Sequence, residues 1–164
     1  MAANTVKMCI RDRIYILRAA KEEIAMVQLI VGEKGKGKTK ILLDKVNKEI
    51  KEATGTFVYL DKSKKHMYEL NNKVRLIDLS EFDIQNSSEF IGFLSGILSQ
   101  DNDLERIFLD SFLKISKVTD EELADVLKRL QTMGEKYQVS FVLSVSKDAS
   151  QLPECAKEMI LVSM

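Results

Sequence analysis

The sequence predicts one α/β domain, a three-layer sandwich in which a mainly parallel sheet is flanked by helices. Short runs rich in β-branched and aromatic residues alternate along the chain with segments of helical periodicity. Strands that alternate with helices need crossover connections, which favour parallel pairing and cover both faces of the sheet. With 164 residues, 45% of them hydrophobic, the chain can form one core but is too short for two ordinary domains.

In the first half of the chain we expect three strands. The apolar run 27–31 leads through a glycine-rich loop into a helical pattern over 39–53. The second strand, 56–60, is followed by a segment around 64–70 that is compatible with a short helix. A third strand is expected over 74–79, where β-branched and other apolar residues recur.

The second half continues the alternation. A helix is predicted over 87–99, and the apolar run 106–110 follows it as the fourth strand. The next helix, 120–137, begins behind a capping box, Thr119-Asp120-Glu121-Glu122, in which side chains and backbone amides can bond reciprocally. The last two strands are predicted over 139–145 and 159–163.

Composition narrows the choice of partners. Lys and Arg together number 25, as do Asp and Glu, so no overall field attracts nucleic acid or anionic lipid. The longest strongly apolar segment, 90–98, is far shorter than the roughly 20 residues that span a bilayer, so no membrane span is expected. Cys9 and Cys155 show neither metal-ligand spacing nor a disulfide framework, which fits a reducing cytoplasm.

Residues 1–25 look like a non-native or upstream-translated leader. The hexapeptide Met8-Cys9-Ile10-Arg11-Asp12-Arg13 resembles the translation of a transposase adapter used in sequencing libraries. Lys21-Glu22-Glu23 back-translates to a purine-rich ribosome-binding sequence a few codons before Met26, our preferred start. The alternative is a short native amphipathic helix over 13–25. We therefore assign the nucleotide-binding domain to residues 26–164.

The most specific motif follows the first strand. The run Gly32-Glu33-Lys34-Gly35-Lys36-Gly37-Lys38-Thr39 matches G-x-x-x-x-G-K-[ST], a phosphate-binding loop. Its glycine-rich backbone can turn N–H groups toward phosphates, its lysine can reach the outer phosphates as a catalytic group, and its threonine hydroxyl can bind Mg²⁺. The predicted nucleotide-binding residues are Gly32, Glu33, Lys34, Gly35, Lys36, Gly37, Lys38, Thr39 and Lys40.

A second part of the site is expected where the fourth strand ends. Arg106-Ile107-Phe108-Leu109-Asp110 is an apolar strand that ends in a carboxylate, a Walker B pattern. The ends of parallel strands meet at one edge of the sheet, so Asp110 could hold a magnesium-bound water beside Thr39. The alternative is a strand that ends at a turn aspartate. We predict Thr39 and Asp110 as the metal residues.

Together these residues resemble the RecA-like branch of the P-loop NTPases. In that branch a second strand ends in an acidic tract and the Walker B strand often ends Asp-Ser, as Val58-Tyr59-Leu60-Asp61 and Leu109-Asp110-Ser111 do here. The resemblance covers most of residues 26–164. It implies the P-loop NTPase fold, with ATP as ligand and Mg²⁺ as cofactor.

Catalytic residues beyond Lys38 are less clearly marked. The family's water-polarising glutamate, shortly after the second strand, is replaced here by Asp61-Lys62-Ser63, which implies slow hydrolysis. Asp61 or Glu81 could act as general base, but a turn or capping role is an equal alternative for each. Ser146, after the fifth strand, occupies the place where related ATPases carry a polar γ-phosphate sensor.

The base of the nucleotide is predicted to be adenine. Lys147-Asp148 resembles part of the N/T-K-x-D motif with which GTPases read guanine, but the motif's aspartate would fall at Ala149. Adenine, which is recognised mainly by shape and backbone contacts, is therefore preferred.

Two groups of basic residues flank the predicted site. Lys34 and Lys36 either contribute to phosphate binding or are solvated. The second group could guide an anionic ligand or a nucleic-acid backbone, or could be a solvated loop; it comprises Lys62, Lys64, Lys65 and His66. His66 is not predicted to be catalytic, because no motif places a carboxylate or nucleophile near it.

These features lead to three functional hypotheses. The first is a Mg²⁺-dependent ATPase that is slow alone or stimulated by a protein partner or a homo-oligomer. Any arginine finger supplied by a second copy must be Arg75, Arg106 or Arg129, the arginines that follow Met26. The second is a nucleotide-dependent binding switch with little turnover. The third, a small-molecule kinase, is disfavoured because such enzymes usually clamp phosphates with several arginines and a lid.

Overall fold

The structure is a computed structural model that describes residues 25–164. The predicted leader therefore lies, apart from its last residue, outside the described residues. Within them, six parallel strands form one sheet in the order β3-β2-β4-β5-β1-β6. The strands are β1 Val27–Val31, β2 Thr56–Asp61, β3 Val74–Asp78, β4 Leu104–Leu109, β5 Ser140–Val145 and β6 Ile160–Ser163.

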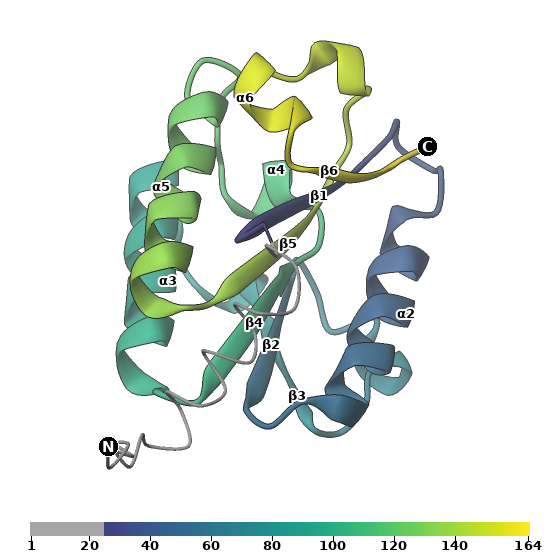
Figure 1. The fold of residues 1–164 in the computed structure, drawn as a ribbon, viewed down its shortest axis with the longest axis vertical. Helices are drawn as coiled ribbons and strands as arrows, with labels where there is room; N and C mark the ends of the chain where they lie inside the picture. Colours follow the sequence, from purple (N-terminus) through teal and green to yellow (C-terminus); the bar gives the residue numbers. More distant parts are fainter. Residues whose placement is uncertain (1–24) are drawn as a thin grey trace, which may run out of the picture.

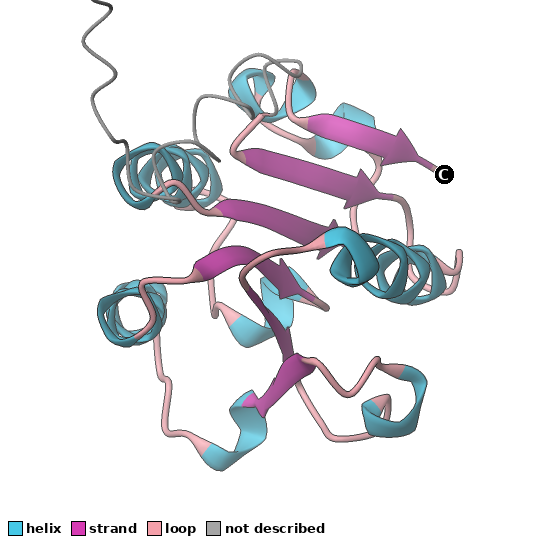
Figure 2. Cartoon of the chain, turned by 60° about the horizontal axis from the view of Figure 1, so that its bottom comes forward, coloured by secondary structure: helices cyan, strands magenta, loops and turns pink. Residues whose placement is uncertain are grey.

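Helices cover both faces of the sheet (Figure 2). They are α2 Lys38–Glu49, α3 Ser87–Gln100, α4 Phe112–Ile115, α5 Leu123–Tyr137 and α6 Glu154–Lys157. Figure 1 shows α2 on one side of the strands and α3 and α5 on the other. The predicted three-layer α/β sandwich with a mainly parallel sheet is thus confirmed, and among the described strands the pairing is entirely parallel.

The two faces have separate hydrophobic cores. Beneath α2, Leu42 and Val46 pack with Ile30, Tyr59 and Phe108 from three strands. The larger core on the other face is formed by alternate residues of the same strands together with α3, α5 and α6. Because neighbouring side chains in a strand point to opposite faces, the almost wholly apolar strands of this sequence supply both cores.

Some element boundaries differ from those predicted. The third strand ends at Asp78, whose side chain accepts a hydrogen bond from the Ser80 amide and begins the 3₁₀ turn Leu79–Glu81. The predicted helix 39–53 ends as α2 at Glu49 and continues as the 3₁₀ turn Ile50–Glu52. The segment around 64–70 contains only the 3₁₀ turn Met67–Glu69. No helix in the described part of the chain is long and apolar enough to cross a membrane.

Candidate functional site

The predicted site residues come from the ends of several strands. The glycine-rich loop follows β1, Asp61 ends β2, Asp110 follows β4, and Ser146 follows β5. The strands are parallel, so these four positions lie at the same edge of the sheet, where open α/β sheets place their ligands. Four chain segments that are far apart in sequence can therefore act on one ligand.

The glycine-rich loop is built for an exposed backbone. Residues 33–37 are exposed, and they connect β1 to the first turn of α2. Gly35 and Gly37 have φ angles of 87° and 89°, a left-handed conformation that side chains other than glycine rarely adopt. The loop thus presents backbone amides and the N-terminus of α2 to solvent, an arrangement that favours anions.

Lys38 lies over this loop. Only 7% of the residue is exposed, and its Nζ donates a 2.8 Å hydrogen bond to the carbonyl oxygen of Glu33. Burial lowers the pKa of Lys38, and the negative charge of Asp110 partly opposes that effect. The ammonium is thus held close to the loop amides, where it could contact a bound phosphate.

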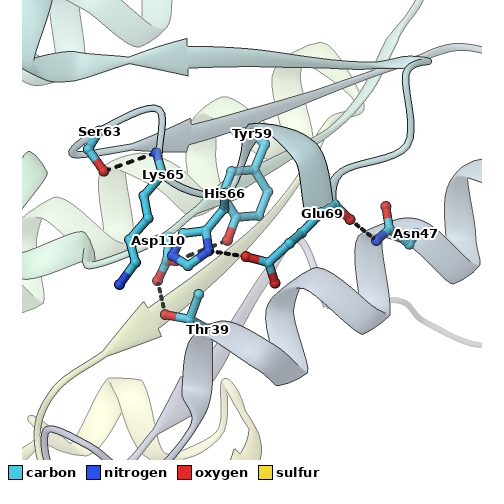
Figure 3. Close-up of polar contacts among 8 residues, drawn as sticks. All are labelled: Thr39, Asn47, Tyr59, Ser63, Lys65, His66, Glu69 and Asp110. Atoms are coloured by element: carbon cyan, nitrogen blue, oxygen red, sulfur yellow. Dashed lines mark hydrogen bonds and ion pairs between the residues drawn. The ribbon is translucent and has the colours of Figure 1, made fainter.

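Thr39 contacts Asp110 across 71 residues of sequence. Its Oγ1 donates a 3.2 Å hydrogen bond to Asp110 Oδ1 (Figure 3). The same oxygen accepts hydrogen bonds from Ser144 Oγ at 2.7 Å and from the Ser111 amide at 2.8 Å, while Oδ2 accepts one from Tyr59 Oη at 3.0 Å. Asp110 is 2% exposed. It is therefore a buried carboxylate, and hydrogen-bond donors from the protein replace the water that it lacks.

The donor Tyr59 is fully buried between α2 and the sheet. Burial first, and the adjacent Asp110 second, raise the pKa of this phenol, which therefore remains protonated and donates to Asp110. No sequence motif points to Tyr59 as a residue of the site.

Asp61 has a different environment. It is 2% exposed, and its Oδ1 accepts a 2.7 Å hydrogen bond from the Lys62 amide, but its buried Oδ2 has no hydrogen-bond partner among the described residues. Burial raises the pKa of Asp61, and repulsion from Asp110 raises it further. A buried carboxylate with a free oxygen is unusual and is often found at functional sites.

His66 joins this pair of carboxylates. A ligand atom from each of Asp61, His66 and Asp110 lies within 4.8 Å of the other two. The Nδ1 of His66 is 2.9 Å from Glu69 Oε1. The imidazole ring lies between Asp110 and Glu69 (Figure 3). Sequence reasoning left His66 out because its loop carries no motif; the fold brings the loop over the strand ends.

Glu81 and Ser146 lie outside this cluster. Glu81 forms an ion pair with Lys64, and its side chain is 53% exposed. Ser146 is exposed just beyond the end of β5, beside the loop, since the Gly32 amide bonds to the Lys147 carbonyl at 2.9 Å. The serine of β5 that contacts Asp110 is Ser144, a polar residue inside an apolar strand, and that exception in the sequence pattern could have identified it.

The pair Lys147-Asp148 is occupied by structural contacts. Lys147 forms an ion pair with Asp120, and Asp148 caps the 3₁₀ turn Ala149–Gln151 by accepting from the Ser150 amide and hydroxyl. These bonds lower the pKa of Asp148. The Asp148 carboxylate would have to break its hydrogen bonds to Ser150 before it could bind a guanine base.

Several lysines surround the site. Lys34, Lys36 and Lys40 are exposed. The ammonium groups of Lys62 and Lys34 lower the pKa of Lys114, which shows that these three cations lie close together. Beside them is a cavity of about 510 Å³ whose lining includes Lys62, Lys114, Lys117, Phe82 and Asp83.

Comparisons with known proteins do not assign the chain to a family. No family model matches the chain, and no curated protein matches it.

Proposed function

We propose that the chain is a P-loop NTPase of the RecA-like type that binds ATP with Mg²⁺. The observation that carries this proposal is the 3.2 Å hydrogen bond between Thr39, at the start of α2, and Asp110, at the end of β4. A glycine-rich motif alone can occur by chance. A motif threonine that meets the carboxylate of a second predicted motif is independent support for a metal–phosphate site.

The described residues have the donor types that such a ligand needs. The exposed loop supplies backbone amides, and Lys38 supplies a cation whose one hydrogen bond among the described residues is to the Glu33 carbonyl. Thr39 and Asp110 supply the hydroxyl and carboxylate oxygens that Mg²⁺ prefers. When bound, Mg²⁺ would neutralise charge on the phosphate oxygens.

We infer that hydrolysis is slow without a partner. Glu81 is exposed and paired with Lys64, so it is a weak candidate for orienting water. Asp61 keeps one oxygen free at the sheet edge and is the better candidate. Among the arginines suggested for a trans finger, Arg106 is already paired with Glu49 at 2.6 Å, which leaves Arg75 and Arg129.

The closest alternative is a nucleotide-dependent switch, in the cytoplasm, whose binding surface changes with its ligand. It is favoured by the absence of the family's glutamate after β2, where the chain has Asp61-Lys62-Ser63. A small-molecule kinase is the third candidate, and the cavity with three lysines beside the loop is the feature that favours it. The phosphoryl acceptor would then carry negative charge.

Calorimetry of the purified chain with ATP and Mg²⁺ tests the proposal. We expect saturable binding that is lost in Lys38→Ala and kept in Lys48→Ala, a matched control with an exposed lysine later in α2. Phosphate release then separates the candidates: release in water indicates an ATPase, release only with an added acceptor a kinase, and binding without release a switch. Absence of binding by the wild-type chain would contradict all three.

A further inference from the structure

The cluster of Asp61, His66 and Asp110 includes a histidine, which a site for Mg²⁺ and phosphate does not require. Mg²⁺ is a hard cation that prefers oxygen ligands and keeps several waters. An imidazole nitrogen instead suits first-row transition metals such as Zn²⁺, Fe²⁺ and Ni²⁺, and carboxylate oxygens are also accepted by Mn²⁺, which can serve as a paramagnetic probe of the site. The presence of His66 within 4.8 Å of both carboxylates therefore needs a separate explanation.

We propose that Asp61, His66 and Asp110 form a site for a divalent transition-metal ion that binds without nucleotide. This site goes beyond the proposed nucleotide function, with which it shares two residues: Asp110, proposed there for Mg²⁺, and Asp61, proposed there to orient water. Metal–ligand bonds of about 2.1 Å place two ligand atoms no more than about 4.2 Å apart. The three ligand atoms already lie within 4.8 Å of one another, so small side-chain shifts suffice to close the site.

The free oxygen of Asp61 is the second, independent observation. Only 2% of Asp61 is exposed, and its Oδ2 has no hydrogen-bond partner among the described residues. A neutral donor would satisfy a single lone pair. A cation would satisfy the free oxygen and also offset the repulsion between Asp61 and Asp110.

The surroundings of His66 have the form that metal sites require. Nδ1 lies 2.9 Å from Glu69 Oε1, so the tautomer with hydrogen on Nδ1 leaves the Nε2 lone pair available to a metal. Metal-bound histidines usually donate their other nitrogen to a carboxylate or carbonyl in this way. Glu69 is thus a positioning residue, and it does not contact the metal.

The loop that carries His66 is fixed to the body of the domain. Asn47 of α2 donates a 2.7 Å hydrogen bond to the Glu69 carbonyl and accepts one of 2.8 Å from the Asn71 amide. These bonds anchor the end of the 3₁₀ turn Met67–Glu69, and the residues just after it, against α2; Figure 3 shows the bond to Glu69. The imidazole is therefore held over the strand ends by contacts other than those of the site itself.

The test is a titration of the nucleotide-free chain with Mn²⁺, in which electron paramagnetic resonance measures free Mn²⁺. We expect saturable binding with a preference for Mn²⁺ over Mg²⁺. Asp61→Asn and His66→Ala should weaken the affinity at least tenfold, and Glu69→Gln about tenfold, which is typical when a carboxylate that orients a metal-binding histidine is lost. Glu135→Gln, which changes an exposed carboxylate on α5, is the matched control and should bind as the wild type does.

A spectroscopic readout identifies the ligand. Electron spin echo modulation of the bound Mn²⁺ should show an imidazole ¹⁴N coupling in the wild type and none in His66→Ala. Circular dichroism confirms that each variant is folded. The proposal is overturned if the wild type shows no saturable binding, or if His66→Ala binds equally tightly. Because no ATP is present, a chain that fails to bind ATP but binds Mn²⁺ would contradict only the proposed nucleotide function.

Discussion

At the scale of single residues, two neighbouring aspartates have opposite hydrogen-bonding environments. Asp110 accepts from Thr39, Ser144, Tyr59 and the Ser111 amide, whereas Asp61, within residues 25–164, accepts only from the Lys62 amide and has a raised pKa. A buried charged group without hydrogen-bond partners costs stability, and removing a well-bonded one leaves its donors unsatisfied. The same substitution should therefore have opposite effects at the two positions.

We expect Asp61→Asn to raise the free energy of unfolding of the metal-free chain at pH 7 by about 1 kcal/mol, because it removes an unfavourable buried charge. Asp110→Asn should lower it by about 1–3 kcal/mol, because the new NH₂ group would face donors. Urea unfolding in the presence of EDTA measures both. A loss of stability in Asp61→Asn would show that its second oxygen is satisfied in solution.

Residues with a sequence motif were easier to predict than residues without one. Loop and strand patterns predict Lys38, Thr39 and Asp110, and the structure brings the last two into contact. The pattern predicts Ser146, the last hydroxyl of the fifth-strand segment, whereas the serine that contacts Asp110 is Ser144. His66 could not be placed, because its position depends on Asn47, which anchors the turn from a separate helix.

At the scale of secondary structure, the capping box before α5 also connects two helices. The Thr119 amide donates to Glu122 Oε2 at 3.1 Å, and the Glu122 amide donates to Thr119 Oγ1 at 3.3 Å. Ser87 Oγ, in the first turn of α3, donates to the same carboxylate oxygen at 3.1 Å. Bonds from the Thr119 amide first, and from Ser87 and the Thr119 hydroxyl, lower the pKa of Glu122.

This shift predicts a dependence on pH. Since the pKa is lower in the folded than in the unfolded chain, ionised Glu122 stabilises the fold above its ordinary pKa. That contribution is lost as the pH falls through the lowered, folded-state value. We expect Glu122→Gln to be less stable than the wild type at neutral pH, with the difference shrinking in acid. Thermal unfolding across that range measures it, and a difference that does not change with pH would exclude the carboxylate as its cause.

The pattern of strands and helices was predictable because the sheet is buried on both faces and its strands are nearly continuous apolar runs. The ends of elements were harder to place. The predicted helix 120–137 begins as α5 at Leu123, because residues 120–122 form the turn that the capping box closes. Strand β3 stops early because Asp78 bonds to the following turn.

At the scale of the whole molecule, the edge of the sheet concentrates unsatisfied groups. The loop amides are exposed, Lys38 is buried with a lowered pKa, and Asp61 has a free oxygen. The hydrophobic cores on the two faces hold these groups in place. Ligands that satisfy such groups should therefore stabilise the entire domain, since the site consists of segments from across the chain.

We expect ATP with Mg²⁺, at a free concentration 100 times its dissociation constant, to raise the free energy of unfolding by about 2.7 kcal/mol. The same concentration should have little effect on Lys38→Ala, because the variant lacks the cation that we propose contacts phosphate, and a full effect on Lys48→Ala. Urea unfolding with and without ligand measures the change. GTP at equal concentration should stabilise less, since Lys147 and Asp148 are held in other contacts. Equal stabilisation by both nucleotides would show that the site recognises phosphate and metal alone and that the preference for adenine is wrong.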